Sequence, residues 1–165
     1  MKSPGRCLIV CLIIAVLVVS GAAIFYFFFW NSPDKSGRVL EIRDSASGRL
    51  YGKWPLDENG EFSVEFVHSV HRSPVRETFA IDGGLIRPRM TRFSSFGAGM
   101  QSDVEEGQTL TMDGDSMILS GFRSSFIELN YIVGTDSDHL LFVNEEIYSL
   151  RKMCGRNAAI TIRAK

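Results

Sequence analysis

The stretch EFVHSVHRSPVRETFAIDGG, residues 65–84, decides the fold that the sequence predicts. Apolar and polar residues alternate on both sides of Ser73-Pro74, which is the pattern of two strands that each bury one face. Phe66 and His68 belong to one face of the first strand, and Glu77 and Phe79 belong to one face of the second. The stretch therefore predicts an antiparallel hairpin whose shared apolar face also carries two ionisable side chains.

The same character recurs along residues 38–165, where short alternating runs are separated by turn residues and no long run has helical periodicity. Ten segments fit a strand: 38–44, 49–56, 61–70, 75–82, 85–93, 108–113, 116–122, 126–134, 139–143 and 158–164. Short strands at this spacing predict an all-β domain, either a small antiparallel β-sandwich or a partly open barrel.

The apolar pattern also suggests how the first two strands pair. A two-residue turn at Arg72-Ser73 would place Phe66 opposite Phe79 and His68 opposite Glu77, so that apolar residues meet apolar residues. A register shifted by an even number of residues would keep the faces matched and change only the partners.

Gly83-Gly84 predicts a second two-residue turn, into a third strand. Regular pairing puts Arg92 on the face of Glu77, although Pro88 cannot donate a ladder hydrogen bond and marks an edge or a bulge. We therefore expect His68, Glu77 and Arg92 at one end of an otherwise apolar face. Because an unpaired buried charge is costly, the cluster is either a structural ion-pair network or a recognition site for an anion or a partner, anchored by Arg92.

The segment RFSSFGAGM, residues 92–100, adds a glycine-rich loop to this predicted site. Its backbone N–H groups can form a nest that holds an anion, whereas the alternative is a tight loop in which only glycine fits the backbone. The predicted binding residues are Arg92, Ser94, Ser95, Gly97, Gly99, His68 and Glu77.

A metal site is the first alternative, because His68, His71, His139 and Glu77 are all metal-binding residue types. Strand residues three apart point to opposite faces, so His68 and His71 diverge. We therefore predict no metal, no cofactor and no catalytic residue. The competing hypothesis is a hydrolase or metal-dependent enzyme that uses His68, Glu77 and His139.

A serine nucleophile is the second alternative. The block GDSM, residues 114–117, and the block DSDH, residues 136–139, resemble those of the GDS-type lipases and esterases. The stretch MDGDS is equally a hairpin turn with Asp-Gly at its centre, and the surrounding pattern is β rather than α/β. We therefore interpret Ser116 as a turn residue.

Residues 8–30 carry no charge and are long enough for a membrane-spanning helix, which needs about 20 apolar residues. Lys2 and Arg6 precede this segment, so the tail 1–7 is expected in the cytoplasm, the linker 31–37 follows the anchor, and residues 38–165 form an extracytoplasmic domain. A signal peptide cleaved within SGAA, residues 20–23, is the alternative. Cleavage there would leave IFYFFFW at the end of a soluble protein, so we favour the retained anchor.

Charge and cysteine content limit the function further. The chain has 18 bases and 19 acids, and this near-neutral balance gives no support for nucleic-acid binding. Cys7 and Cys11 lie near the predicted anchor and Cys154 is alone in the β domain, so no disulfide within that domain is possible. The domain must be stabilised by its hydrophobic core.

Two quoted stretches, FVHSVHRSPVRETFAIDGGLI at 66–86 and RFSSFGAGM, resemble the bacterial family catalogued as domain of unknown function 1850. The matching positions are His68-Ser69-Val70, Pro74-Val75, Glu77, Arg92 through Gly99, and His139. The resemblance covers most of residues 38–163. His71 stands where that family usually has an acidic residue, which argues against a role for His71 and leaves His68.

The resemblance implies a small exported β protein, often encoded beside tripartite ATP-independent periplasmic (TRAP) transporters of the TAXI type. We therefore expect a single-pass protein of the bacterial inner membrane that binds a transporter permease or its solute-binding protein and contacts lipid through residues 8–30. A purely structural envelope protein is a further alternative.

Overall fold

The structure is a computed structural model that describes residues 38–69, 72–94 and 104–165. All of these residues belong to one compact unit, Ser36–Lys165. The predicted tail, membrane anchor and linker over residues 1–37 lie outside the described residues. In the part of the chain that is described, no helix is long and apolar enough to cross a membrane.

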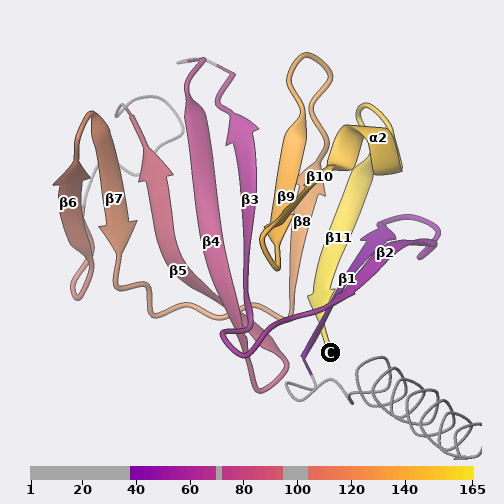
Figure 1. The fold of residues 1–165 in the computed structure, drawn as a ribbon, viewed down its shortest axis with the longest axis horizontal. Helices are drawn as coiled ribbons and strands as arrows, with labels where there is room; N and C mark the ends of the chain where they lie inside the picture. Colours follow the sequence, from indigo (N-terminus) through magenta and orange to yellow (C-terminus); the bar gives the residue numbers. More distant parts are fainter. Residues whose placement is uncertain (1–37, 70–71, 95–103) are drawn as a thin grey trace, which may run out of the picture. The chain divides into compact units, whose positions relative to one another are not determined.

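Antiparallel strands dominate the described chain, which confirms the predicted all-β fold (Figure 1). The elements are β1 (Val39–Asp44), β2 (Leu50–Pro55), β3 (Glu61–Val67), β4 (Pro74–Asp82), β5 (Leu85–Phe93), β6 (Thr109–Asp113), β7 (Ser116–Ser120), β8 (Glu128–Ile132), β9 (His139–Val143), β10 (Glu146–Ser149), α2 (Leu150–Cys154) and β11 (Ala159–Ala164).

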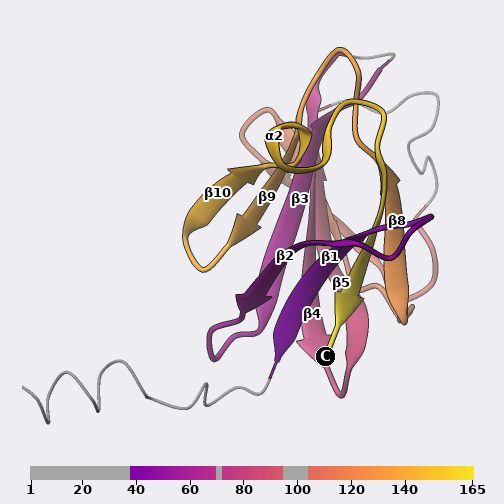
Figure 2. The same cartoon turned by 90° about the vertical axis from the view of Figure 1, so that its right-hand side faces the viewer.

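The strands form a four-stranded sheet, in the order β2-β1-β11-β8, and a seven-stranded sheet, in the order β10-β9-β3-β4-β5-β7-β6. Figure 2 shows the four-stranded sheet lying against one face of the seven-stranded sheet. Ile42 and Ile162 from the first sheet pack in one core with Val64 and Leu141 from the second, and all four are fully buried. Alternation on both inner faces therefore produces a sandwich around a shared core.

One side of the sandwich is partly closed. An isolated bridge joins β5 to the segment just before β8: the N–H groups of Ile86 and Phe126 each donate to the carbonyl of the other residue, at 2.8 Å. Apart from this bridge, β8 is hydrogen-bonded to β11, and β5 is hydrogen-bonded to β4 and β7. The fold is thus a sandwich with some of the character of the predicted partly open barrel.

A second apolar cluster lies toward the β6–β7 end of the seven-stranded sheet. Val75, Phe93, Met117 and Leu119 pack together on its inner face, apart from the main core. Figure 1 shows β7 and β6 extending away from the four-stranded sheet at this end. The inner face of β4 therefore runs from the main core, at Phe79, to this second cluster, at Val75.

The β3–β4 hairpin confirms the predicted faces and corrects the predicted partners. Phe62 lies opposite Phe79, and Val64 lies opposite Glu77. The loop closes where the His68 N–H donates to the Ser73 carbonyl at 2.9 Å, so the turn is longer than the predicted Arg72-Ser73 pair. Because the side-chain period is two, a shift of four residues preserves every face, and the apolar pattern cannot select between the two registers.

The β4–β5 hairpin has the predicted two-residue turn, since Asp82 pairs with Leu85 across Gly83 and Gly84, whose φ angles are 58° and 78°. The predicted irregularity at Pro88 is a bulge: Phe79 pairs with Pro88, but the preceding Thr78 pairs with Met90. β5 lies between β4 and β7, so it is not an edge strand.

The bulge reverses the faces of the second half of β5. Arg92 pairs with Arg76, and Thr91 pairs with Glu77. The prediction that Arg92 shares the face of Glu77 is therefore wrong, because one extra residue in a strand moves every following side chain to the other face.

Two elements near the C-terminus were not expected from the alternation: β10, which pairs with β9, and the one-turn helix α2. The Ser149 hydroxyl caps α2 by accepting the Lys152 N–H at 3.0 Å, and the Asp138 carboxylate accepts the Arg151 N–H at 2.9 Å. A five-residue helix is too short to show helical periodicity.

Candidate functional site

The predicted cluster of His68, Glu77 and Arg92 does not form. His68 lies in the loop after β3, Glu77 lies on the inner face of β4, and Arg92 lies on the outer face of β5. The expectation that these three residues share one end of an apolar face is therefore wrong. The predicted residues Ser95, Gly97 and Gly99 lie outside the described residues, as does His71, which is a candidate only for a metal site. The three described residues instead belong to three different clefts.

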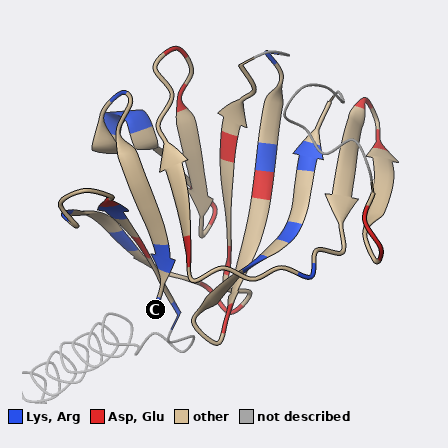
Figure 3. Cartoon of the chain, turned by 180° about the vertical axis from the view of Figure 1, so that it is seen from behind, with Lys and Arg blue, Asp and Glu red and all other residues tan. Residues whose placement is uncertain are grey.

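The first is the arginine cleft, about 310 Å³ in volume and lined by residues that include Glu65, Arg76, Arg92, Phe93, Ser94 and Ser116. It lies on the outer face of the seven-stranded sheet, and it brings Arg92 and Ser94 together as predicted. Figure 3 shows basic segments on neighbouring strands of this sheet with acidic segments beside them. Arg76, which is not among the predicted binding residues, lies directly opposite Arg92.

Each arginine of this cleft already has a carboxylate partner. The Nε of Arg76 donates to Glu65 at 2.8 Å, and its guanidinium carbon lies 3.9 Å from the centre of the Phe142 ring. The Nη2 of Arg92 lies 2.7 Å from Asp113. A guanidinium has five N–H donors, so both side chains retain donors for a further acceptor. Like charges directly opposite on neighbouring strands repel, and an anion between them would relieve that repulsion.

The second is the end cleft, about 670 Å³ in volume and lined by residues that include Phe66, His68, Arg72, Gly134, Asp136 and His139. The His139 ring stacks on Phe66 with 5.3 Å between ring centres, and its Nδ1 accepts the Gly134 N–H at 3.1 Å. Burial lowers the pKa of His139, so the neutral ring carries its proton on Nε2 at neutral pH.

The loop between β8 and β9 packs closely at Gly134, whose N–H group binds His139. A Cβ atom at Gly134 would lie 2.3 Å from the Ser137 carbonyl oxygen, so no larger residue fits without moving the backbone. His68 and His139 line the same cleft, but Glu77 does not. The residues described here contain no group of three or more His, Cys, Asp or Glu that could hold a metal ion.

Ser116 and His139 cannot act as a pair. They lie on β7 and β9, with β3, β4 and β5 between them, and neighbouring strands are about 4.8 Å apart. Ser116 pairs with Asp113 across a two-residue turn, as predicted for MDGDS. The turn residues are Gly114 and Asp115, one position beyond the predicted Asp-Gly centre, and Gly114 has a φ of 60°.

The third is the carboxylate cleft, about 360 Å³ in volume and lined by residues that include Glu77, Tyr131, Pro88, Met90, Phe122 and Phe126. It is lined by residues of β5 and β8 and by Phe126, which forms the isolated bridge to Ile86. The Tyr131 hydroxyl donates to the Oε2 of Glu77 at 2.7 Å. This bond connects the two sheets, since Glu77 is on β4 and Tyr131 is on β8.

The carboxyl group of Glu77 is in an unfavourable environment for its charge. Burial raises its pKa, and the Tyr131 hydrogen bond only partly offsets this effect. Burial and the neighbouring Glu77 also raise the pKa of the Tyr131 hydroxyl, which therefore stays protonated. The rings of Tyr131 and His139 form a T-shaped pair, with 6.2 Å between the ring centres. Tyr131 thus lies between Glu77 of this cleft and His139 of the end cleft.

Tyr131 could have been found from the sequence. It alternates with Leu129 and Val133 within the predicted strand 126–134, and this alternation predicts that its side chain lies on the buried face. A buried tyrosine hydroxyl needs an acceptor, and Glu77 is a carboxylate on the buried face of another strand.

Comparison with known proteins identifies the family of the chain. The family described as Domain of unknown function (DUF1850) matches residues 62–150, and the chain belongs to it. The match spans the three clefts, from Phe66 to His139. No curated protein and no solved structure matches the chain.

Proposed function

We propose that this member of the family is a membrane-anchored, extracytoplasmic binding protein that serves a TRAP-type secondary transporter of the TAXI group. In this proposal, it contacts the transporter's permease or its solute-binding protein through the arginine cleft. The family membership supports the proposal by way of the gene neighbourhood that the resemblance implies. The observation that carries it is the direct opposition of Arg76 and Arg92 on the outer face of the sheet.

The two arginines suit the recognition of an acidic group. Guanidinium groups bind carboxylates and phosphates in a bidentate manner. The hydroxyls of Ser94 and Ser116 line the same cleft and add donors of the kind that a carboxylate accepts. The side chains of Arg92 and its partner Asp113 are 44% and 59% exposed, so a competing carboxylate can reach this ion pair without disturbing the core.

The anchor over residues 8–30 gives the proposal its second component. A domain held at the membrane meets a membrane partner at a much higher effective concentration than a free domain does. A weak contact made by a few exposed arginines is then sufficient for function.

Co-purification tests the proposal. The full chain, tagged at its C-terminus, is isolated from native membranes in mild detergent, and its partners are identified by mass spectrometry. We expect a transporter permease or solute-binding protein to co-purify, and Arg92→Ala to reduce its recovery about tenfold or more, as expected for a lost hydrogen bond to a charged group.

Arg87→Ala is the matched control, because Arg87 is also 44% exposed and also pairs with one carboxylate, Asp82. Both variants should keep the stability of the parent protein, since exposed substitutions change it by about 0.5 kcal/mol or less. Recovery of the protein without a transporter component would contradict the accessory role. Equal recovery with Arg92→Ala and Arg87→Ala would contradict the role of the arginine cleft.

A further inference from the structure

The carboxylate cleft has an unusual combination of charge and apolar surface. Among the described residues that line it, Glu77 is the one charged side chain. The walls include the aromatic rings of Phe79, Phe122 and Phe126, and Phe126 is 40% exposed at the cleft. A carboxylate in such a setting is costly unless a partner compensates its charge.

The described residues supply only part of that compensation. The Tyr131 hydroxyl binds Oε2 of Glu77, and no described residue donates a hydrogen bond to Oε1. A tyrosine hydroxyl is a neutral donor, so the negative charge of the ionised carboxylate remains without a cation. The cleft therefore contains one carboxylate that lacks a cationic partner among the described residues, and apolar surface lies around this carboxylate.

We propose that the carboxylate cleft binds an organic ammonium ion with an apolar body, through an ion pair with Glu77. An ammonium group would donate to the free carboxylate oxygen, and it would neutralise the charge that burial makes costly. The aromatic walls would contact the apolar body and add cation–π attraction. An organic anion would face the carboxylate without any lining base to offset the repulsion, and a purely apolar ligand would leave the charge uncompensated.

This inference does not depend on the proposed transporter role. Glu77 lies on the inner face of β4, and the arginine cleft is built from the outer face of the same strand and its neighbours. A ligand of one cleft therefore does not occupy the other. Failure of the co-purification experiment would leave the ammonium site standing, and failure of the ammonium site would leave the arginine contact standing.

Calorimetric titration of the full chain in detergent tests the inference. The probes are hexylammonium and hexanoate, which have the same apolar body and opposite charge, at a mildly alkaline pH that ionises Glu77. We expect saturable binding of hexylammonium, weakened about ten- to a hundredfold in Glu77→Gln, the range for one hydrogen bond to a charged group. Glutamine keeps the size of Glu77 and can still accept the Tyr131 hydrogen bond, so the variant should fold.

Glu61→Gln is the control for a simple change of net charge, because Glu61 is an exposed carboxylate on β3 outside this cleft. It should bind hexylammonium like the parent protein. Comparable binding of hexanoate, undiminished hexylammonium binding by Glu77→Gln, or an equal loss in Glu61→Gln would each overturn the inference. Absence of hexylammonium binding to the parent protein would overturn it as well.

Discussion

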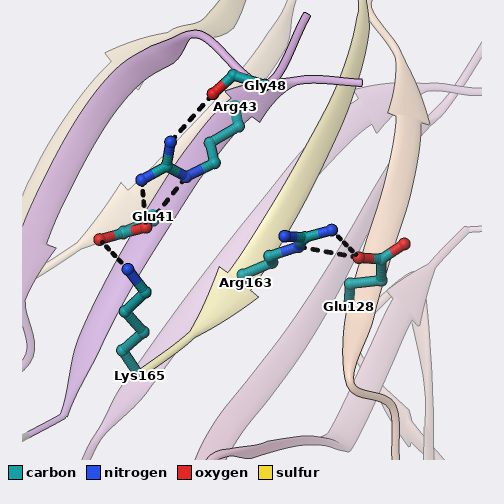
Figure 4. Close-up of polar contacts among 6 residues, drawn as sticks. All are labelled: Glu41, Arg43, Gly48, Glu128, Arg163 and Lys165. Atoms are coloured by element: carbon teal, nitrogen blue, oxygen red, sulfur yellow. Dashed lines mark hydrogen bonds and ion pairs between the residues drawn. The ribbon is translucent and has the colours of Figure 1, made fainter. Parts of the chain in front are cut away.

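Two glutamates, the buried Glu41 and the partly buried Glu77, have opposite electrostatic environments in the same fold. Glu41 lies on the outer face of the four-stranded sheet, and its side chain is only 4% exposed (Figure 4). Arg43 donates to its Oε2 from two nitrogens, at 2.9 and 3.1 Å, and the Lys165 ammonium lies 3.1 Å from its Oε1. Among the described residues, Glu77 has no cationic partner, and its one hydrogen-bond donor is the Tyr131 hydroxyl.

The pKa values of the two groups move in opposite directions. Burial alone would raise the pKa of Glu41, but the hydrogen bonds from Lys165 and Arg43 outweigh it and lower the pKa. For Glu77, burial dominates and the pKa is raised. The side chains that hide Glu41 also neutralise it, which identifies a structural ion pair. Partial burial between the sheets raises the pKa of Glu77, and no described residue supplies a cation to it. Groups with pKa values perturbed in this way are candidates for function.

The largest expected effect comes from removing the one donor that Glu77 has. Tyr131→Phe should lower the free energy of unfolding at neutral pH by about 1–3 kcal/mol, since it leaves a buried polar group unsatisfied. Denaturant unfolding of the full chain measures this change. Tyr51→Phe is the matched control, because the Tyr51 hydroxyl also donates to a partly buried carboxylate, Asp44, at 3.1 Å, but Asp44 keeps further donors in the N–H groups of Ala46 and Ser47. Equal losses in the two variants would remove the distinction between a carboxylate with one donor and a carboxylate with several.

A smaller effect distinguishes the two glutamates by the sign of their pH dependence. The raised pKa of Glu77 means that the native protein loses stability as the pH rises above the ordinary value of 4.5 and through the folded-state pKa. Glu77→Gln should lack this loss, so its stability relative to the parent protein should increase across that window and then level off. Unfolding measured over a series of pH values would show it.

Glu41→Gln should show the opposite sign in the same experiment. The lowered pKa of Glu41 stabilises the native protein above 4.5, and this contribution is lost as the pH falls through the folded-state pKa. The basic partners Arg43 and Lys165 are 29% and 61% exposed, so solvent screens these ion pairs. The variant should therefore be less stable than the parent protein above 4.5 by the roughly 0.2–1 kcal/mol typical of solvent-screened ion pairs, and added salt should reduce the difference. Profiles of the same sign for both variants would contradict the comparison.

The sequence predicted the faces of this molecule better than its pairings. Alternation along Phe62–Phe66 and Val75–Ile81 assigned each side chain to its correct face, because burial has the same period as the strand. Register was not predictable, because a loop longer by four residues preserves that alternation. The bulge was foreseen at Pro88, but its consequence for Arg92 was not, because regular pairing was assumed beyond it.

The candidate sites were predictable only in part for the same reason. Arg92 and Ser94 were assigned to one site, and they do share a cleft, but Arg76 joins them only through the pairing that the bulge creates. Alternation places Tyr131 and Glu77 each on a buried face, but the local pattern of the two strands does not show which residues meet between the sheets. β10 and α2 were missed because they are too short to show a period.

Carbon NMR titration of the glutamate carboxyl groups in the full chain, with and without hexylammonium, tests the central claim most directly. Glu77→Gln and Glu41→Gln assign the two signals. We predict a pKa above 4.5 for Glu77 and below 4.5 for Glu41, with hexylammonium lowering the first and leaving the second unchanged. A Glu77 signal that titrates at or below 4.5 and does not respond to hexylammonium would contradict the account.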